Sequence, residues 1–257
     1  MNSKSKNLQI MWCLFWIACA AFTFLLWDPS YKLEYSLIPA LSKNHFWGAD
    51  SFGRNALLLT LRGSFISLAF SFIVVILTIL IGFLYAMLLF IFPNRIFQFF
   101  SKWILDFSLS LPFLILALSI AALRGSSWST LLFALLVGTS PLFCRLIATR
   151  SEELAQEPYV HASLAIGTKP FLIFKKHFIP ALVSLGSVKV PNLFAHALIG
   201  ESTLSFLGVG APIGADTWGS LLHEGHYYLL EAPHIAIIAG VPLFLTLYSL
   251  QQLSQHD

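Results

Sequence analysis

Six long apolar runs place the strongest limit on how this chain can fold. Each run has roughly the length of a helix that crosses a bilayer, which takes about 20 residues. The runs cover residues 8–27, 64–92, 103–123, 128–148, 178–200 and 233–250. Lipid admits only helices and closed barrels, and these runs lack the alternation of barrel strands. The sequence therefore predicts an all-α, polytopic membrane protein with six transmembrane helices.

The composition also indicates a membrane domain. The 257 residues are 57% hydrophobic and 11% charged, whereas soluble domains carry about 25% charged residues. The first run follows two lysines and could be read as a signal peptide, but it is long for one. Its cleavage-like sequence, Ala18-Cys19-Ala20, lies inside the apolar run. We therefore expect this run to be retained as the first span.

Positive charges divide unequally between the two sides of the predicted bundle. With six spans both termini share a side, which holds nine of the Lys and Arg residues against five on the other. Because cytoplasmic loops carry the excess of Lys and Arg, we expect both termini and the segment 152–176 in the cytoplasm. The last outer loop, predicted over 201–233, has four acidic residues and no Lys or Arg.

A polar insert, residues 152–176, separates the fourth and fifth apolar runs. Pro158 fits the first turn of a helix, and the pattern predicts that helix over 159–166. Gly167 suits the turn that ends it, and Pro170 prevents continuation. A second helix, capped by Thr168, is expected to follow. A polar helix–Gly–helix segment must lie outside the lipid, where a soluble partner can reach it.

Small residues and prolines indicate how the spans pack. The second run has a seam of small residues at three- and four-residue spacing, which predicts close helix packing along one face. The seam consists of Ser64, Ser67, Ser71, Thr78 and Gly82. The third, fourth and fifth runs contain Pro112, Pro141 and Pro191, and a proline inside a helix predicts a kink.

The insert resembles a loop of a known family. Residues 159–163 with Gly167 and Pro180 are similar to the Glu-Ala-Ala…Gly…Leu-Pro loop of ABC importer permeases. His161 stands at the Glu of that motif and Ser163 at its second Ala. The exchange of His for Glu removes a negative charge from this position.

Two further segments resemble one branch of these permeases. Residues 45–55 read His-Phe-Trp-Gly-Ala-Asp-Ser-Phe-Gly-Arg-Asn and are similar to its Gly-Thr-Asp…Gly-Arg-Asp segment. Residues 201–210 with Trp218-Gly219 are similar to its Glu-Ala-Ser-Leu-Ser-Phe-Leu-Gly-Leu-Gly…Trp-Gly segment. The branch is the dipeptide/oligopeptide/nickel permeases, and the match is to the second of their two permease subunits. The resemblance covers about residues 45–250.

This resemblance implies a membrane subunit of an ATP-driven importer in the bacterial inner membrane, forming the pathway for peptides or a similar small solute. The implied partners are a second permease subunit, two ATP-binding subunits and an extracytoplasmic solute-binding protein. In that family the loop is a coupling helix that sits in a groove of an ATP-binding subunit. The residues of this chain that match the loop are Tyr159, His161, Ala162, Ser163, Gly167 and Pro180.

The same reading divides the chain into two parts. Residues 1–62 hold the tail, the first span and an outer loop, and residues 63–257 form a five-helix permease core with the coupling loop 152–180. On the fifth run, Lys189, Asn192 and His196 share one face. Because a charge inside a membrane is costly, this stripe predicts a lining of the solute pathway. In the alternative, Lys189 snorkels to the interface while the other two side chains bond to neighbouring helices.

Catalysis is not indicated. The chain has no Gly-x-x-x-x-Gly-Lys-Ser/Thr phosphate loop, so we expect a non-enzymatic transport subunit without a cofactor, a bound metal or a nucleic-acid partner. The alternative class is a secondary carrier driven by an ion gradient. Such a carrier needs inverted repeats or broken helices with midplane carboxylates, and the sequence shows neither.

Three local arrangements are weaker signals. Lys102 and Asp106 lie four residues apart and predict an ion pair within one helix. Asp50 and Arg54 are expected to fix the fold of their loop or a subunit contact rather than touch solute. Loop residues of metal-binding type are present, although their spacing is a weak indication of a site. They are His45, Asp216, His223, Glu224 and His226.

Overall fold

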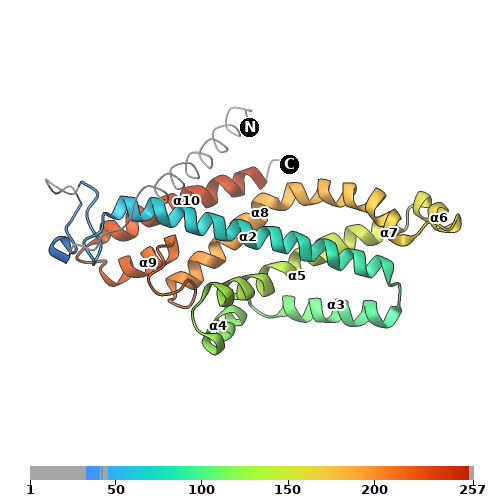
Figure 1. Cartoon of the computed structure of the whole chain (residues 1–257), viewed down its shortest axis with the longest axis horizontal. Coiled ribbons are helices and arrows are strands. Elements are labelled where there is room, and N and C mark those ends of the chain that lie inside the picture. The colour runs from blue at the N-terminus through green and yellow to red at the C-terminus, as the bar shows by residue number, and fades with distance from the viewer. Residues whose placement is uncertain (1–32, 41, 43–45, 255–257) are drawn as a thin grey trace.

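The computed structural model describes residues 33–40, 42 and 46–254. Over these residues the chain is built from helices and loops, and an isolated antiparallel bridge joins Ala49 and Asn55. The all-α prediction is confirmed. The long helices run side by side along the longest axis of the molecule, and shorter helices cover its two ends (Figure 1).

Four helices are long and apolar enough to cross a membrane, and a bent pair forms a fifth candidate span within the described residues. The long helices are α2 (Ala56–Ile91), α5 (Trp128–Ala155), α8 (Ile179–Phe206) and α10 (Pro233–Ser254). The bent pair is α3 (Arg95–Ser110) with α4 (Phe113–Arg124). The shorter elements are η1 (Leu33–Tyr35), α6 (Pro158–Ala165), α7 (Pro170–Ile173), η2 (Phe174–Phe178) and α9 (Trp218–Tyr227). The predicted first span, 8–27, lies outside the described residues.

The third predicted span is not one helix. Its two halves, α3 and α4, meet at 92°. Pro112 has no N–H for a helical bond, and its ring holds Leu111 in an extended conformation with φ −91° and ψ 133°. The predicted kink at Pro112 is therefore confirmed, and it is sharp enough to divide the predicted span into two helices. Pro141 and Pro191 remain inside α5 and α8.

The small-residue seam of α2 is buried, as predicted. Ser64, Ser67, Ser71, Thr78 and Gly82 are all among its buried residues. A Cβ added to Gly82 would lie 2.6 Å from the ring of Phe143, so the glycine is what lets α5 approach α2. The Thr78 and Thr139 hydroxyls join the same two helices at 3.2 Å. The helix itself begins eight residues before the predicted span, because the Asn55 side chain accepts from the N–H groups of Leu57 and Leu58.

The fifth predicted span also continues further than expected. Helix α8 ends at Phe206, so Glu201 belongs to its last turns and is completely buried. The expectation that Glu201 opens an exposed outer loop is therefore wrong. The helix stops where Gly208 takes φ +75° and the amides of Gly208 and Val209 bond back to Ser205 and Leu204.

Candidate functional site

Helix α6 is anchored to the bundle by one buried side chain and by the aromatic residues that follow it. Val160 is fully buried and packs in the same apolar cluster as Phe174 and Phe178 of η2. The ring of Phe90, near the end of α2, lies 4.4 Å from that of Phe178. These contacts hold the insert against the ends of α2 and α5. We call the insert and η2, residues 152–178, together with the adjoining ends of α2 and α5, the α6 end.

Gly167 makes the turn that reverses the chain after α6. Its φ is +81°, a conformation that glycine adopts without the Cβ penalty. The Gly167 amide bonds to the Leu164 carbonyl at 3.0 Å and the Thr168 amide to the Ser163 carbonyl at 3.1 Å, the two bonds of a Schellman cap. The helix–Gly–helix prediction is confirmed. The cap of the second helix is Lys169 rather than Thr168, and its side chain makes no capping bond.

The outward side of the insert is where the predicted coupling residues lie. His161 and Ala162 are exposed, Ser163 is half-buried and donates to the Tyr159 carbonyl at 2.7 Å, and Pro180 is exposed in the first turn of α8. Several apolar side chains stand beside them, and Ile166 is 82% exposed. The others are Tyr159, Phe171 and Leu172. This surface is apolar enough to dock on a protein partner.

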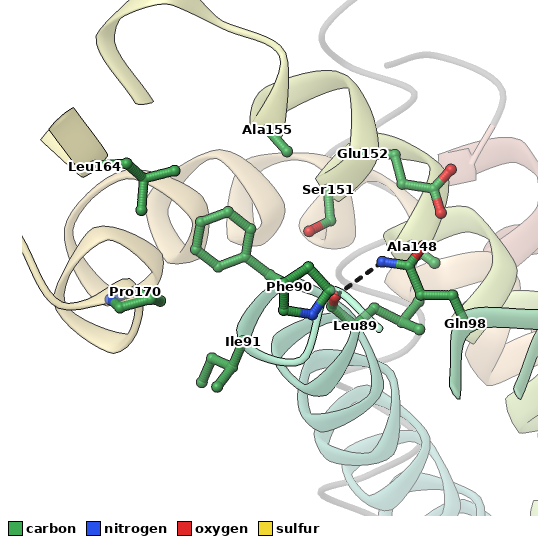
Figure 2. A pocket seen from close by; sticks show the side chains of 11 residues that line it. Leu89, Phe90, Ile91, Gln98, Ala148, Ser151, Glu152, Ala155, Leu164 and Pro170 are labelled. Carbon is green, nitrogen blue, oxygen red and sulfur yellow. Dashed lines mark hydrogen bonds between the residues drawn. The ribbon is translucent and has the colours of Figure 1, made fainter. Parts of the chain in front are cut away.

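A hollow of about 270 Å³ lies behind the insert, where α6 faces the end of α2. Figure 2 shows Leu164 and Pro170 on one side of it and Phe90 and Ile91 on the other. On the far wall the Gln98 side chain donates to the Leu89 carbonyl at 3.4 Å. The insert is thus fastened at Val160, at α7 and at η2, and the hollow separates α6 from the end of α2.

Of the three residues in the predicted stripe on α8, His196 lines a cavity. His196 lines a hollow of about 300 Å³ together with Phe113 and Thr139. Asn192 is exposed and Lys189 is half-buried, and neither of them lines this hollow. The arrangement places His196 beneath the bend between α3 and α4.

The opposite end of the bundle, which we call the α9 end (residues 46–55 and 207–232), holds a buried charge cluster. Asp50 accepts from the Arg54 side chain at 2.6 Å and from its backbone N–H at 2.7 Å, and Arg54 also reaches Asp216 at 3.0 Å. Asp50 and Arg54 therefore fix the loop that starts α2, as predicted. Burial opposes the charge of Arg54, but Asp216 and Asp50 outweigh this and raise the pKa of the guanidinium. Burial raises the pKa of Asp216, and Arg54 and Arg62 offset part of that shift.

Glu201 of α8 is a buried residue next to this end, whereas the sequence predicts it in the outer loop. Its carboxyl group accepts from the hydroxyls of Ser205 at 2.9 Å and Ser202 at 3.3 Å. Ser67 of α2 and Thr217 also interact with the same group. The carboxyl group thus connects α2, α8 and the start of α9. The run of hydroxyl residues after Glu201 was the available signal.

The other charged residues pair differently from the sequence prediction. Lys102 binds Glu152 at 2.6 Å and Asp106 binds Arg145 at 3.3 Å. The predicted ion pair between Lys102 and Asp106 is therefore wrong, because both side chains turn towards α5.

The weakly indicated metal residues have other partners. Glu224 accepts from the backbone N–H and the hydroxyl of Ser51, His223 contacts the Phe206 carbonyl, and Asp216 binds Arg54. His45 lies outside the described residues. Within the described part of the chain no group of three His, Cys, Asp or Glu side chains is placed to hold a metal ion.

Similarity to known proteins agrees with this arrangement. Residues 78–256 match the family described as "Binding-protein-dependent transport system inner membrane component", and the chain belongs to that family. It is 27% identical to the glutathione transport system permease protein GsiD of Pectobacterium atrosepticum, over 95% of this chain and 88% of that protein. It is 34% identical to GsiD of Shigella flexneri, over 80% of this chain and 67% of that protein.

The fold has a solved counterpart. A chain of the MetNI methionine ABC transporter, in an inward-facing conformation, superposes with a TM-score of 0.62 at 20% identity and covers 84% of this chain and 96% of that one. The chain is therefore a multi-pass inner-membrane permease subunit of an ABC importer, of the dipeptide/oligopeptide/nickel group, and not an ion-driven carrier.

Proposed function

We propose that the insert is the coupling element through which this permease receives the work of ATP hydrolysis. The supporting observation is a short helix that is fastened to the bundle by Val160 while His161 and Ala162 face outward. Closure of the ATP-binding subunits moves α6, and the continuous helix from Pro170 to Phe206 carries the movement into the membrane. The coupling residues are Tyr159, His161, Ala162, Ser163, Gly167 and Pro180.

The partners follow from the same role. The complex contains a second permease subunit, two ATP-binding subunits that carry out the hydrolysis, and an extracytoplasmic solute-binding protein. This chain contributes no catalysis. Both termini and the insert lie in the cytoplasm, and the excess of Lys and Arg on that side supports this orientation. Residues 1–62 hold the first span, the outer loop and the first residues of α2, and residues 63–257 form the core.

The solute is a short peptide or a molecule of similar size. The supporting observation is that two relatives are named glutathione permeases, and glutathione is a small peptide. His196, in the hollow beneath the α3–α4 bend, lines the pathway. Lys189 and Asn192, which both precede His196 along α8, line the pathway between His196 and the insert in the assembled complex. ATP-driven uptake of labelled glutathione and of simple dipeptides into vesicles tests this assignment.

Substitution of Ala162 by Trp tests the coupling surface. The residue is exposed, so the larger side chain leaves the fold intact but blocks close docking. We expect the ATP-binding subunit to be lost from the purified complex. The control is Ile213→Trp, at an exposed position of the α9 end, which should keep the subunit. Retention of the ATP-binding subunit and of uptake in Ala162→Trp would overturn the assignment.

A further inference from the structure

Helix α3 has its polar side turned towards the protein and its aromatic side turned away. None of its sixteen residues, all of them described, is buried. Its polar side chains contact α2 and α5: Ser101 lies 3.2 Å from the hydroxyl of Tyr85, and Gln98 donates to α2. The apolar side chains that point away are more than half exposed. They are Ile96, Phe99, Phe100, Trp103, Ile104 and Phe107. A helix at the surface of a soluble protein has the opposite arrangement.

Two ion pairs connect this polar side to α5. The Lys102–Glu152 side chains are 46% and 47% exposed, and the Asp106–Arg145 side chains 60% and 61%. All four residues belong to helices that are candidate membrane spans. Charges within such helices face a bundle interior or a water-filled cavity, because lipid cannot solvate them. The exposed half of each pair must therefore face water or another polar group.

The ion pairs lie in a continuous series of hollows. One hollow, of about 190 Å³, is lined by Tyr85, Leu105 and both pairs. A second, of about 430 Å³, shares Arg145 and Thr149 with the first and extends to α8. A third is the His196 hollow, which shares Leu142 with the second. Along α5 these residues recur at three- and four-residue spacing, so one helix face borders all three hollows.

We propose that these three hollows form a water-filled groove that carries the solute through the cytoplasmic half of the membrane, with α3 as one of its walls. We call it the α3–α5 groove. This rests on the proposed function, since it assumes a transporting complex and the stated orientation. The paired charges sum to zero, so the groove attracts neither bare cations nor bare anions strongly. A hydrophilic solute with both charge signs can exchange partners with an ion pair and leave no charge alone.

Cysteine accessibility tests which side of α3 faces water. The native cysteines, Cys13, Cys19 and Cys144, are first replaced by Ser in the complete transporter, held in inverted membrane vesicles. Leu105→Cys then reports on the groove and Phe100→Cys on the aromatic side of the same helix. The probe is a negatively charged methanethiosulfonate that does not cross membranes. Phe100 is the more exposed of the two residues in the isolated chain, so exposure alone predicts that it reacts faster.

We expect the opposite order. Leu105→Cys should react about tenfold faster than Phe100→Cys or more, because the charged reagent is excluded from lipid, and its modification should stop uptake. Faster reaction at Phe100→Cys, or no reaction at either position, overturns the groove. Co-purification of the ATP-binding subunit is measured on the same vesicles. If the unsubstituted complex lacks that subunit, the proposed function has failed and not the groove alone.

A charge-exchange experiment distinguishes a groove that carries solute from a site that binds lipid headgroups. Asp106→Arg places a second cation beside Arg145 and should reduce uptake at least severalfold with the complex still assembled. The double variant Asp106→Arg with Arg145→Asp restores the pair and should recover most of the uptake. The groove is overturned if both variants transport normally and only the co-purified phospholipid changes, which would assign the charges to lipid headgroups. Failure of the exchange to recover uptake also counts against it.

Discussion

The two ends of the bundle use similar ion pairs in different surroundings. At the α9 end Arg54 is 7% exposed and is held by Asp50 and Asp216. At the α6 end Glu152 is 47% exposed and binds Lys102. A buried pair cannot lose one partner without leaving a desolvated charge, whereas a half-exposed pair can separate into water. The comparison indicates that the α9 end keeps one geometry and that the α6 end is the part suited to move.

The contacts made by uncharged side chains also differ between the two ends. At the α9 end Trp218 is fully buried, its indole N–H donates to the Thr60 carbonyl at 3.2 Å and its backbone N–H to Ser67 at 3.1 Å. At the α6 end α6 is separated from α2 by a hollow, and Ile166 is 82% exposed. Four substitutions, with effects expected to decrease from the first to the last, test this difference between the ends.

The largest effect is expected for Arg54→Ala. It leaves Asp50 and Asp216 buried without their cation, which costs about 3–5 kcal/mol of unfolding free energy. Thermal unfolding of the purified protein in detergent measures this loss. Arg62→Ala is the control, since Arg62 is 24% exposed and 3.7 Å from Asp216, and it should cost much less. Equal losses for the two variants would show that the cluster is not centred on Arg54.

Gly219→Ala should destabilise the α9 end by about 1–3 kcal/mol through overpacking. An added Cβ would overlap the Ser202 carbonyl oxygen and lie 2.7 Å from the Ser205 Cβ, where α9 meets α8. The same thermal assay detects the loss. Gly240→Ala is the matched control, because its Cβ would lie 3.4 Å from the mobile end of Leu222. An unchanged Gly219→Ala protein would mean that α8 and α9 can separate at no cost.

Gly167→Ala should cost about 1–2 kcal/mol in the turn of the insert, the penalty for a Cβ in the left-handed region. The cost is conformational, because nothing lies within 4 Å of the added Cβ. Gly167→Asn should cost less, since Asn tolerates this conformation. The rate of hydrogen exchange at the amides of positions 167 and 168 measures how far the cap is loosened. Equal exchange in the Ala and Asn variants would argue against a conformational origin.

The smallest effect is expected for Lys102→Met. Because the pair with Glu152 is half-exposed, its loss should change the unfolding free energy by about 0–1 kcal/mol. The comparison with Arg54→Ala in one assay is the direct measure of the difference between the ends. A loss as large as that of Arg54→Ala would show that the α6 end is also rigidly bonded.

Several features of the fold could be predicted from local sequence. The apolar runs identified five of the spans among the described residues, and Pro112 marked the break between α3 and α4. Gly167 marked the turn of the insert, because the turn depends on the positive φ of this one residue. Helix ends were less predictable. Asn55 extends α2 beyond its apolar run, and hydroxyl partners keep Glu201 inside α8.

The candidate site was predictable only in outline. The motif placed Ala162 and Gly167 correctly on an exposed insert, but the anchoring role of Val160 depends on η2, which is π-helical, and on α2. The stripe on α8 included His196, which lines a hollow, together with two residues that do not line this hollow. Helical spacing predicts that the three residues share one face of α8. The packing of the neighbouring helices determines whether that face lines a cavity.

The sequence by itself determined that this chain crosses a membrane as helices and that a polar insert with a glycine turn lies between two spans. These are local properties, set by apolar length, by proline and by the conformation of single residues. The tertiary structure decided that Lys102 pairs with Glu152 rather than with Asp106, and that the aromatic side of α3 points outward. Both depend on α5 lying beside α3, and the contact joins residues tens of positions apart, which local spacing does not encode.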